Sequence, residues 1–271
     1  MKIRNFIKYV FLLFAVTTLI IACNENEETI EESLTAVEIT SILSVDDVTL
    51  LVDDIIDQDE ADDPFTLRSS QSSIANCVTR TVEELDTQRI VTLDFGTGCT
   101  TNNGREFSGI IRIVYSQTGN GVSKEVSFNN FYINSNNIAG SRLYQVTRQN
   151  SNGNPEASIT VDLTITFSGG ISVSRRGTKV REKIEGANTD TRGDDVYSVT
   201  GNWQTINRQG VVRTAEVTTA LIREFSCKYF VSGVIDFTRG EASASLDFGN
   251  GECDNVATVS GPNGNSFQIN L

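Results

Sequence analysis

Hydrophobic and polar residues alternate along most of the chain from Phe65 to Leu271. The runs Ile159–Phe167 and Ala242–Phe248 alternate without interruption, and Tyr229–Phe237 keeps one apolar face. A period of two predicts strands with one buried and one solvent-facing side, which is typical of antiparallel sheets. Further strands, with weaker alternation, are expected at residues 88–95, 106–116, 122–134, 137–148, 194–206 and 209–223.

Turn signals separate these runs, at Asn103-Gly104, Asn120-Gly121, Asn152-Gly153, Gly169-Gly170, Gln209-Gly210, Arg239-Gly240 and Asn263-Gly264. Asn-Gly is the strongest short hairpin signal, because both central positions of a type I′ turn need a positive φ. Only three prolines occur, as a protein rich in strand pairing requires. The sequence therefore predicts an all-β domain over residues 65–271. We expect an antiparallel meander of roughly a dozen strands that forms a curled sheet, an open barrel or a sandwich.

A helical period precedes the β region and predicts a short acidic amphipathic helix over residues 44–64. Its apolar face would hold Val45, Val48, Leu51, Val52, Ile55 and Ile56, and its solvated face Asp46, Asp47, Asp53, Asp54 and Asp57. Ser44 followed by Asp47 suggests a capping arrangement at the start of the helix.

One motif occurs twice. Leu93-Asp94-Phe95-Gly96-Thr97-Gly98-Cys99 returns as Leu246-Asp247-Phe248-Gly249-Asn250-Gly251-Glu252-Cys253. In each copy the Leu and Phe are expected to point inward, and the Asp to accept hydrogen bonds from turn amides. The glycines would let the chain reverse tightly. The structural turn residues predicted in this way are Asp94, Gly96, Gly98, Asp247, Gly249 and Gly251.

The five cysteines of the chain fit the same duplication. If Cys23 carries a lipid, the remaining even number in an exported protein predicts two disulfides. The favoured pairs are Cys77–Cys99 and Cys227–Cys253, because a duplicated unit should repeat its local bridge. Each bridge would stabilise the fold by about 3 kcal/mol. A pairing that joins the two copies is the alternative. No metal site is expected, because the chain lacks Cys-x-x-Cys pairs and histidine.

The N-terminus has the pattern of an export signal. Three basic residues precede the apolar run Tyr9–Ala22, which predicts a signal peptide over residues 1–22. The run ends in Leu19-Ile20-Ile21-Ala22-Cys23, which resembles the lipobox of bacterial lipoproteins. That resemblance implies that Cys23 is acylated, with palmitate-type chains, and becomes the first mature residue. An ordinary secretory signal or an N-terminal membrane anchor is the alternative.

Charge is distributed unevenly. The chain has 22 basic and 35 acidic residues, a net charge of −13, but no Lys or Arg lies between Asn24 and Asp63. Residues 23–43 are therefore expected to be an acidic flexible tether, which anionic head groups would repel. No basic footprint for nucleic acid exists. Lys179, Arg181 and Lys183 would share one strand face, either as a site for anionic glycan or as a solvated edge.

Taken together, the lipobox, the acidic helix and the two Asp-Phe-Gly-x-Gly motifs with their cysteines resemble a group of outer-membrane lipoproteins of Bacteroidota. That group has no assigned activity and supplies no functional residues. The resemblance implies an outer-membrane location. The acidic run Asn24–Glu28 resembles the signal that sends such lipoproteins to the cell surface, and an orientation toward the periplasm is the alternative.

No enzyme and no cofactor are expected, because the chain has no histidine and no nucleophile motif. The sequence favours a lipid-anchored envelope protein with a non-catalytic binding or structural role. Its partners would be the membrane, through Cys23, and a glycan, lipid or envelope protein. One alternative is a carrier of an apolar ligand or lipid within the curled sheet, which requires an apolar cavity. A second alternative is a fimbrial-type subunit.

Overall fold

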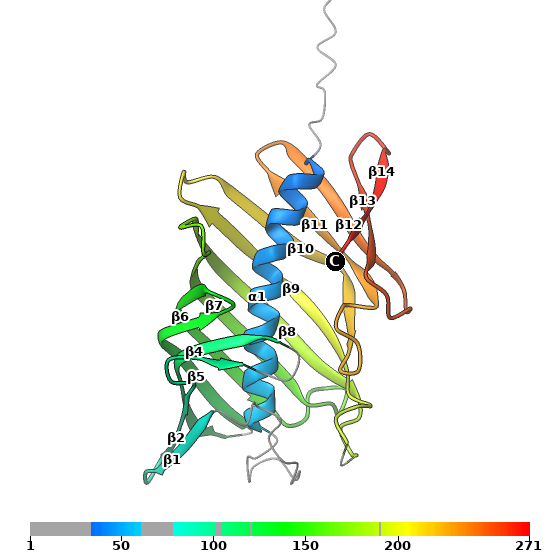
Figure 1. Ribbon diagram of the computed structural model, residues 1–271. Coiled ribbons are helices and arrows are strands. Elements are labelled where there is room, and N and C mark those ends of the chain that lie inside the picture. Colours follow the sequence, from blue (N-terminus) through cyan, green and yellow to red (C-terminus); the bar gives the residue numbers. More distant parts are fainter. Residues whose placement is uncertain (1–33, 61–77, 101–103, 120, 190) are drawn as a thin grey trace, which may run out of the picture. The chain divides into compact units, whose positions relative to one another are not determined.

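The computed structural model describes residues 34–60, 78–100, 104–119, 121–189 and 191–271. This part of the chain forms one helix and a single antiparallel sheet of fourteen strands (Figure 1). The predicted signal peptide, Cys23 and Cys77 lie outside the described residues. The elements are α1 (Ala36–Glu60), β1 (Thr79–Glu84), β2 (Gln88–Asp94), β3 (Cys99–Thr100), β4 (Glu106–Thr118), β5 (Gly121–Ile133), β6 (Asn136–Thr147), β7 (Glu156–Thr166), β8 (Ser172–Glu185), β9 (Val196–Asn207), β10 (Val212–Glu224), β11 (Ser232–Arg239), β12 (Ala242–Asn250), β13 (Val256–Ser260) and β14 (Ser266–Asn270).

The sheet is a meander, as the alternation predicts. Its strands neighbour one another in chain order from β1 to β14, and the short β3 pairs with β4 off this path. In the part of the chain described, β1 and β14 form its two edges, so the sheet is open and curled. The glycine turns predicted at Asn152-Gly153, Gly169-Gly170, Gln209-Gly210 and Asn263-Gly264 all lie between consecutive strands.

The helix is longer than predicted, because it begins at Ala36 rather than Ser44. A capping box sets this start. The Thr35 hydroxyl accepts a hydrogen bond from the amide of Glu38 (3.3 Å), and the Glu38 carboxylate accepts one from the amide of Thr35 (3.2 Å). The end of the predicted tether, residues 36–43, is therefore helical.

The core lies between α1 and one face of the sheet (Figure 1). Early helix residues such as Ile39 and Ile42 pack with the C-terminal half of the sheet, around Trp203 and Phe237. Residues from Val45 to Ile56 pack with strands of the N-terminal half. The helix therefore crosses both halves and joins two apolar clusters.

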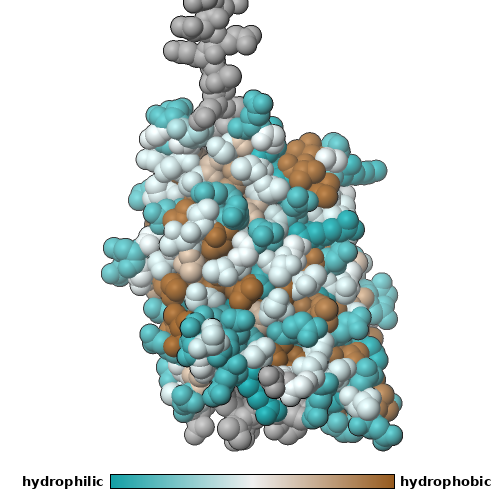
Figure 2. Space-filling view, turned by 180° about the vertical axis from the view of Figure 1, so that it is seen from behind, coloured by the Kyte–Doolittle hydropathy of each residue, from teal (hydrophilic) through white to brown (hydrophobic). Residues whose placement is uncertain are grey.

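The face of the sheet away from α1 is mostly hydrophilic, with scattered hydrophobic patches (Figure 2). β7 shows how the two faces arise, since its inward residues Ile159, Val161 and Leu163 are buried while Thr160 and Asp162 are exposed. Among the described residues, no helix combines the length and apolar character that a membrane span requires.

Candidate functional site

Two helix carboxylates point toward the sheet rather than into water. Asp53 forms a buried ion pair with Arg142 of β6, and Asp46 forms one with Arg175 of β8. Both arginine side chains are only 1% exposed. The expectation of a fully solvated acidic face is therefore wrong at these two positions. They lie seven residues apart, which is two helical turns, so they share the face that meets the sheet.

The pair at Asp53 belongs to the more complete of two clusters, in which Arg142 Nε is the one side-chain atom buried without a hydrogen-bond partner among the described residues. Arg142 donates to the Tyr144 hydroxyl (3.2 Å) and to the carbonyl of Thr49 (3.0 Å), while the Tyr144 hydroxyl donates to Asp53 (2.7 Å). Burial, together with the Asp53 carboxylate, raises the pKa of Tyr144 well above its ordinary value. Burial lowers the pKa of Arg142, but Asp53 and Tyr144 more than offset this, so the guanidinium keeps its charge.

The pair at Asp46 belongs to an incomplete cluster. Arg175 donates to Asp46 and to the Thr205 hydroxyl (2.6 Å). Within the described part of the chain, Asp46 Oδ2 and the indole Nε1 of Trp203 are buried without a hydrogen-bond partner. A buried polar atom left unpaired costs about 1–3 kcal/mol. Such atoms call for an explanation, of which a bound water or ligand is one.

Two cations flank the indole of Trp203. The Arg175 guanidinium carbon lies 4.8 Å from the centre of the Trp203 ring system, and Lys179 Nζ lies 4.5 Å from it. Arg175, Gly177 and Lys179 alternate onto the inner face of β8, and Gly177 pairs directly with Trp203 of β9. A Cβ at Gly177 would lie 2.5 Å from Trp203 Cα, so only glycine lets β9 approach this closely.

A cavity of about 140 Å³ adjoins this incomplete cluster, between α1 and the C-terminal half of the sheet. Asp46, Lys179 and Trp203 line it, and its other walls are mainly apolar: Leu43, Leu50, Val199, Leu221, Phe230, Ile235, Phe248 and Leu271. An engineered protein cavity of about 150 Å³ binds benzene. The cavity therefore has room for a compact ligand. We call it the α1 pocket.

Lys179 is the cation that borders the α1 pocket. Burial, together with the positive charge of Arg175, lowers the pKa of the Lys179 amine to about 7. A smaller space of about 30 Å³ continues past Lys179 toward Asp53. Lys179 therefore exchanges its proton near neutral pH beside an apolar cavity.

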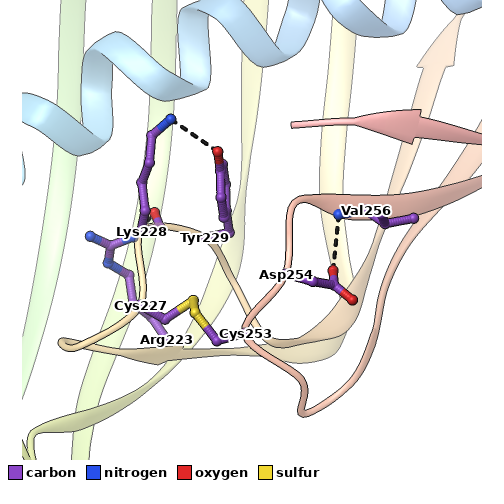
Figure 3. The surroundings of a disulfide bond; sticks show 7 residues. All are labelled: Arg223, Cys227, Lys228, Tyr229, Cys253, Asp254 and Val256. Carbon is purple, nitrogen blue, oxygen red and sulfur yellow. Dashed lines mark hydrogen bonds between the residues drawn. A yellow bond between two sulfur atoms is a disulfide. The ribbon is translucent and has the colours of Figure 1, made fainter.

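A disulfide holds one wall of the α1 pocket. The Cys227–Cys253 bond joins the β10–β11 loop to the β12–β13 loop, which confirms this predicted pairing (Figure 3). Lys228 and Tyr229, next to Cys227, extend toward α1, and both line the pocket with Phe230. Arg223 ties the same loop to the helix, since it donates to the carbonyl of Lys228 (2.7 Å) and to Asp54 (3.1 Å).

The repeated motif performs its predicted local role. The carboxylate of Asp94 accepts from the amide of Gly96, and that of Asp247 from the amide of Gly249, each at 2.8 Å. The chain reverses after Asp94, where β2 ends. The second copy differs, because β12 continues to Asn250 and pairs with Ser232 across a bulge.

The glycines predicted for the two turns also differ between the copies. Gly249 and Gly251 have positive φ angles of 97° and 109°, whereas in the first copy Gly96 has one of 60° and Gly98 has none. Cys99 is buried and disulfide-bonded. Its expected partner, Cys77, lies outside the described residues.

The predicted basic face of β8 turns inward. Lys179 borders the α1 pocket, while Arg181 stacks on the ring of Tyr197 at 4.9 Å. Lys183 donates to the fully buried carboxylate of Asp195 (2.9 Å). The three side chains share one face, as predicted, but Lys179 alone of the three lines the α1 pocket.

A larger, more open cleft of about 550 Å³ lies along α1 next to the α1 pocket, around Asp47, Asp54 and Arg105. Its charges satisfy one another, since Arg223 binds Asp54 and the positive charges of Lys228 and Arg105 lie near Asp47. Burial still raises the pKa of Asp47. We favour the smaller α1 pocket as the site, because it combines apolar walls with unpaired polar atoms.

Comparison of the chain with protein-family models, with curated proteins and with solved structures finds no match. Among the described residues, no group of three or more His, Cys, Asp or Glu side chains is placed to hold a metal ion. The case for a site therefore depends on the geometry of the α1 pocket.

Proposed function

We propose that this protein is a lipid-anchored binding protein of the outer membrane that holds a compact, mainly apolar ligand in the α1 pocket. The observation that carries the proposal is a mainly apolar cavity of about 140 Å³, two of whose lining residues, Asp46 and Trp203, each have a buried polar atom without a partner among the described residues. Ligand sites combine mainly hydrophobic walls with a few polar groups in this way.

The size of the α1 pocket favours a small ligand over a lipid chain. Sites for drug-sized ligands usually measure about 300–1,000 Å³. The pocket is smaller, and Val199, Leu221 and Phe248 fill the space beside it. Of the functions that the sequence suggests, a binder of compact apolar molecules therefore fits better than a lipid carrier.

The proposed location has its support in the N-terminal sequence. The lipobox-like run that ends at Cys23, and the acidic segment after it, favour a lipid anchor with the β domain held away from anionic head groups. Release of acylated peptide that begins at Cys23, detected by mass spectrometry after digestion of purified outer membranes, would support the anchor. A mature chain that begins elsewhere would exclude it.

The single tryptophan makes the binding proposal testable, because Trp203 is the only one in the sequence and lines the α1 pocket. The full-length chain, purified in mild detergent, is titrated with 2-phenylethanol, a neutral apolar probe. We expect a saturable change in Trp203 fluorescence and in its indole N–H signal. Native mass spectrometry of protein extracted from its own membranes would then give the mass of the natural ligand.

Two helix variants provide the control. Leu43→Phe enlarges a half-buried side chain on the pocket wall and should weaken probe binding. Leu51→Phe makes the same change at a half-buried helix position that does not line the α1 pocket, and should leave binding intact. A titration without saturation in the unmodified protein, or equal effects of the two variants, would contradict the proposal.

A further inference from the structure

We infer that the α1 pocket selects a carboxylate: a compact apolar acid whose carboxylate lies beside Lys179 and Trp203, and whose hydroxyl, where present, meets Asp46. This inference rests on the proposed binding function and adds the chemical class of the ligand. Three features of the pocket carry it: the balance of charge, the unpaired hydrogen-bonding atoms and the position of the apolar walls.

The balance of charge favours an anion. Asp46 and Arg175 neutralise each other in their ion pair. Among the described residues, no carboxylate lies within ion-pair distance of Lys179, whose amine instead stacks on Trp203 at 4.5 Å. A protonated Lys179 therefore places a positive charge, without an ion-pair partner among the described residues, at the wall of a mainly apolar cavity. An anionic ligand would supply the missing charge.

The unpaired atoms fit the groups of a hydroxy acid. Lys179 and the Trp203 indole N–H are hydrogen-bond donors, and a carboxylate offers two acceptor oxygens. Asp46 Oδ2, which is buried without a partner among the described residues, is an acceptor. A ligand hydroxyl would donate to it. The apolar side of the ligand would pack against Phe230 and Phe248.

The protonation of Lys179 links this recognition to pH. Its pKa of about 7 means that the amine is mostly neutral in mildly alkaline solution. An anion that binds the protonated form must therefore bring about proton uptake, and its affinity falls as the pH rises through this value. Other charged or titratable groups that face Lys179 or line the same space are Arg175, Arg181, Asp46, Asp53, Arg142, Asp47, Asp54, Tyr197, Arg223, Lys228 and Tyr229.

Three probes of similar size separate the features: 2-phenylethanol is neutral, phenylacetate adds the carboxylate, and mandelate adds a hydroxyl. Each is titrated into the full-length protein at about pH 6 and at about pH 9, with Trp203 fluorescence as the readout. At the lower pH we expect mandelate to bind most tightly and 2-phenylethanol least. Above the pKa of Lys179, the dissociation constants of both acids should rise roughly tenfold per pH unit, and that of the alcohol should stay constant.

Substitutions at Lys179 test the assignment. Lys179→Met should remove the preference for acids, so that phenylacetate no longer binds more tightly than 2-phenylethanol. Lys179→Arg keeps a positive charge, so it should retain the preference but lose its pH dependence. Lys124→Met is the matched control, because Lys124 is a buried, inward-facing lysine of the other half of the sheet. It should change neither property.

The outcomes distinguish a failure of the carboxylate assignment from a failure of the proposed binding function on which it rests. If no probe binds, the proposed function itself fails. If 2-phenylethanol binds but the acids bind no more tightly, or their affinity is independent of pH, the binding function stands and the carboxylate assignment is overturned. Unchanged phenylacetate binding in Lys179→Met would overturn it as well.

Discussion

The two ion pairs that connect α1 to the sheet have the same composition but differ in how completely their atoms are hydrogen-bonded. Asp53–Arg142 and Asp46–Arg175 both join a helix carboxylate to an inward-facing arginine that is 1% exposed. In the first pair, Tyr144 and a backbone carbonyl supply further hydrogen bonds, and Arg142 Nε is the one side-chain atom left buried without a partner among the described residues. In the second pair, one carboxylate oxygen is unpaired and a cavity of about 140 Å³ adjoins it.

The difference separates a structural role from a binding role. A buried ion pair is stable only when hydrogen bonds satisfy its remaining atoms. The Asp53–Arg142 cluster comes closer to that condition from within the chain, because Arg142 Nε is its one unpaired buried side-chain atom among the described residues. The C-terminal half leaves room, unpaired polar atoms and a lysine with a pKa of about 7 at one place. We attribute the incompleteness of the second cluster to the proposed ligand.

The largest expected effect comes from breaking the Asp53–Arg142 pair. Asp53→Ala would leave Arg142 buried without its counter-charge and should lower the free energy of unfolding by about 4 kcal/mol. Asp46→Ala should cost only about 2 kcal/mol, because water in the adjoining cavity can solvate Arg175 and an unpaired oxygen is removed. Urea denaturation of both variants measures the difference. Equal losses would mean that the two clusters are energetically alike.

A smaller loss of stability is expected when the disulfide of the C-terminal half is removed. Replacing Cys227 and Cys253 by serine should lower the free energy of unfolding by about 3 kcal/mol. It should also weaken probe binding, because the bond holds the loop that carries Lys228 and Tyr229 (Figure 3). The same double substitution at Cys77 and Cys99 should cost a similar stability and leave binding unchanged. Loss of binding in both variants would argue against a local role of the bond.

Removal of the half-buried Lys179 should stabilise the protein. Below pH 7, Lys179 is protonated in both the folded and the unfolded chain, and the folded state bears the full cost of burying the charge. Between this value and the ordinary pKa of 10.5, the unfolded chain binds the additional proton, so stability rises with pH.

Lys179→Met, which cannot be charged, should therefore be more stable by about 2 kcal/mol at mildly acidic pH. The gain should shrink as the pH approaches 10.5, where the wild-type amine is neutral in both states. Urea denaturation at several pH values measures it. A variant less stable than the wild type at mildly acidic pH would show that the Lys179–Trp203 contact outweighs the cost of burial.

Most of the fold follows from local sequence signals. Period-two runs such as Ile159–Phe167 fix the strands, and Asn152-Gly153 and similar pairs fix the hairpins, because neither depends on distant residues. The start of the helix was also available in the sequence, as the Thr35-x-x-Glu38 capping box. The curl of the sheet around α1 was one of three predicted arrangements, because alternation does not specify how a sheet closes.

The site was harder to predict, although its residues left a signal. Asp46 and Asp53 lie on the same helical stripe as Ile39, Ile42 and Thr49, at intervals of three, four and seven residues, so extending the helix back to Ile39 would have placed them on a buried face. Likewise, Arg142 and Arg175 fall on the inward positions of their strands. The charge of these residues suggested solvent exposure. The cavity itself depends on tertiary packing, which no local pattern contains.

The smallest expected effect comes from the helix cap. Thr35→Ala removes the hydroxyl that accepts the amide of Glu38 and should lower the free energy of unfolding by about 1 kcal/mol. Only the first turn of α1, which packs on the C-terminal half through Ile39, should fray. Amide hydrogen exchange should therefore quicken near Ile39 and stay slow near Val52 in the other half. Uniformly faster exchange would mean that the two halves of the sheet unfold together as one cooperative unit. The two ion pairs would then belong to the same unit.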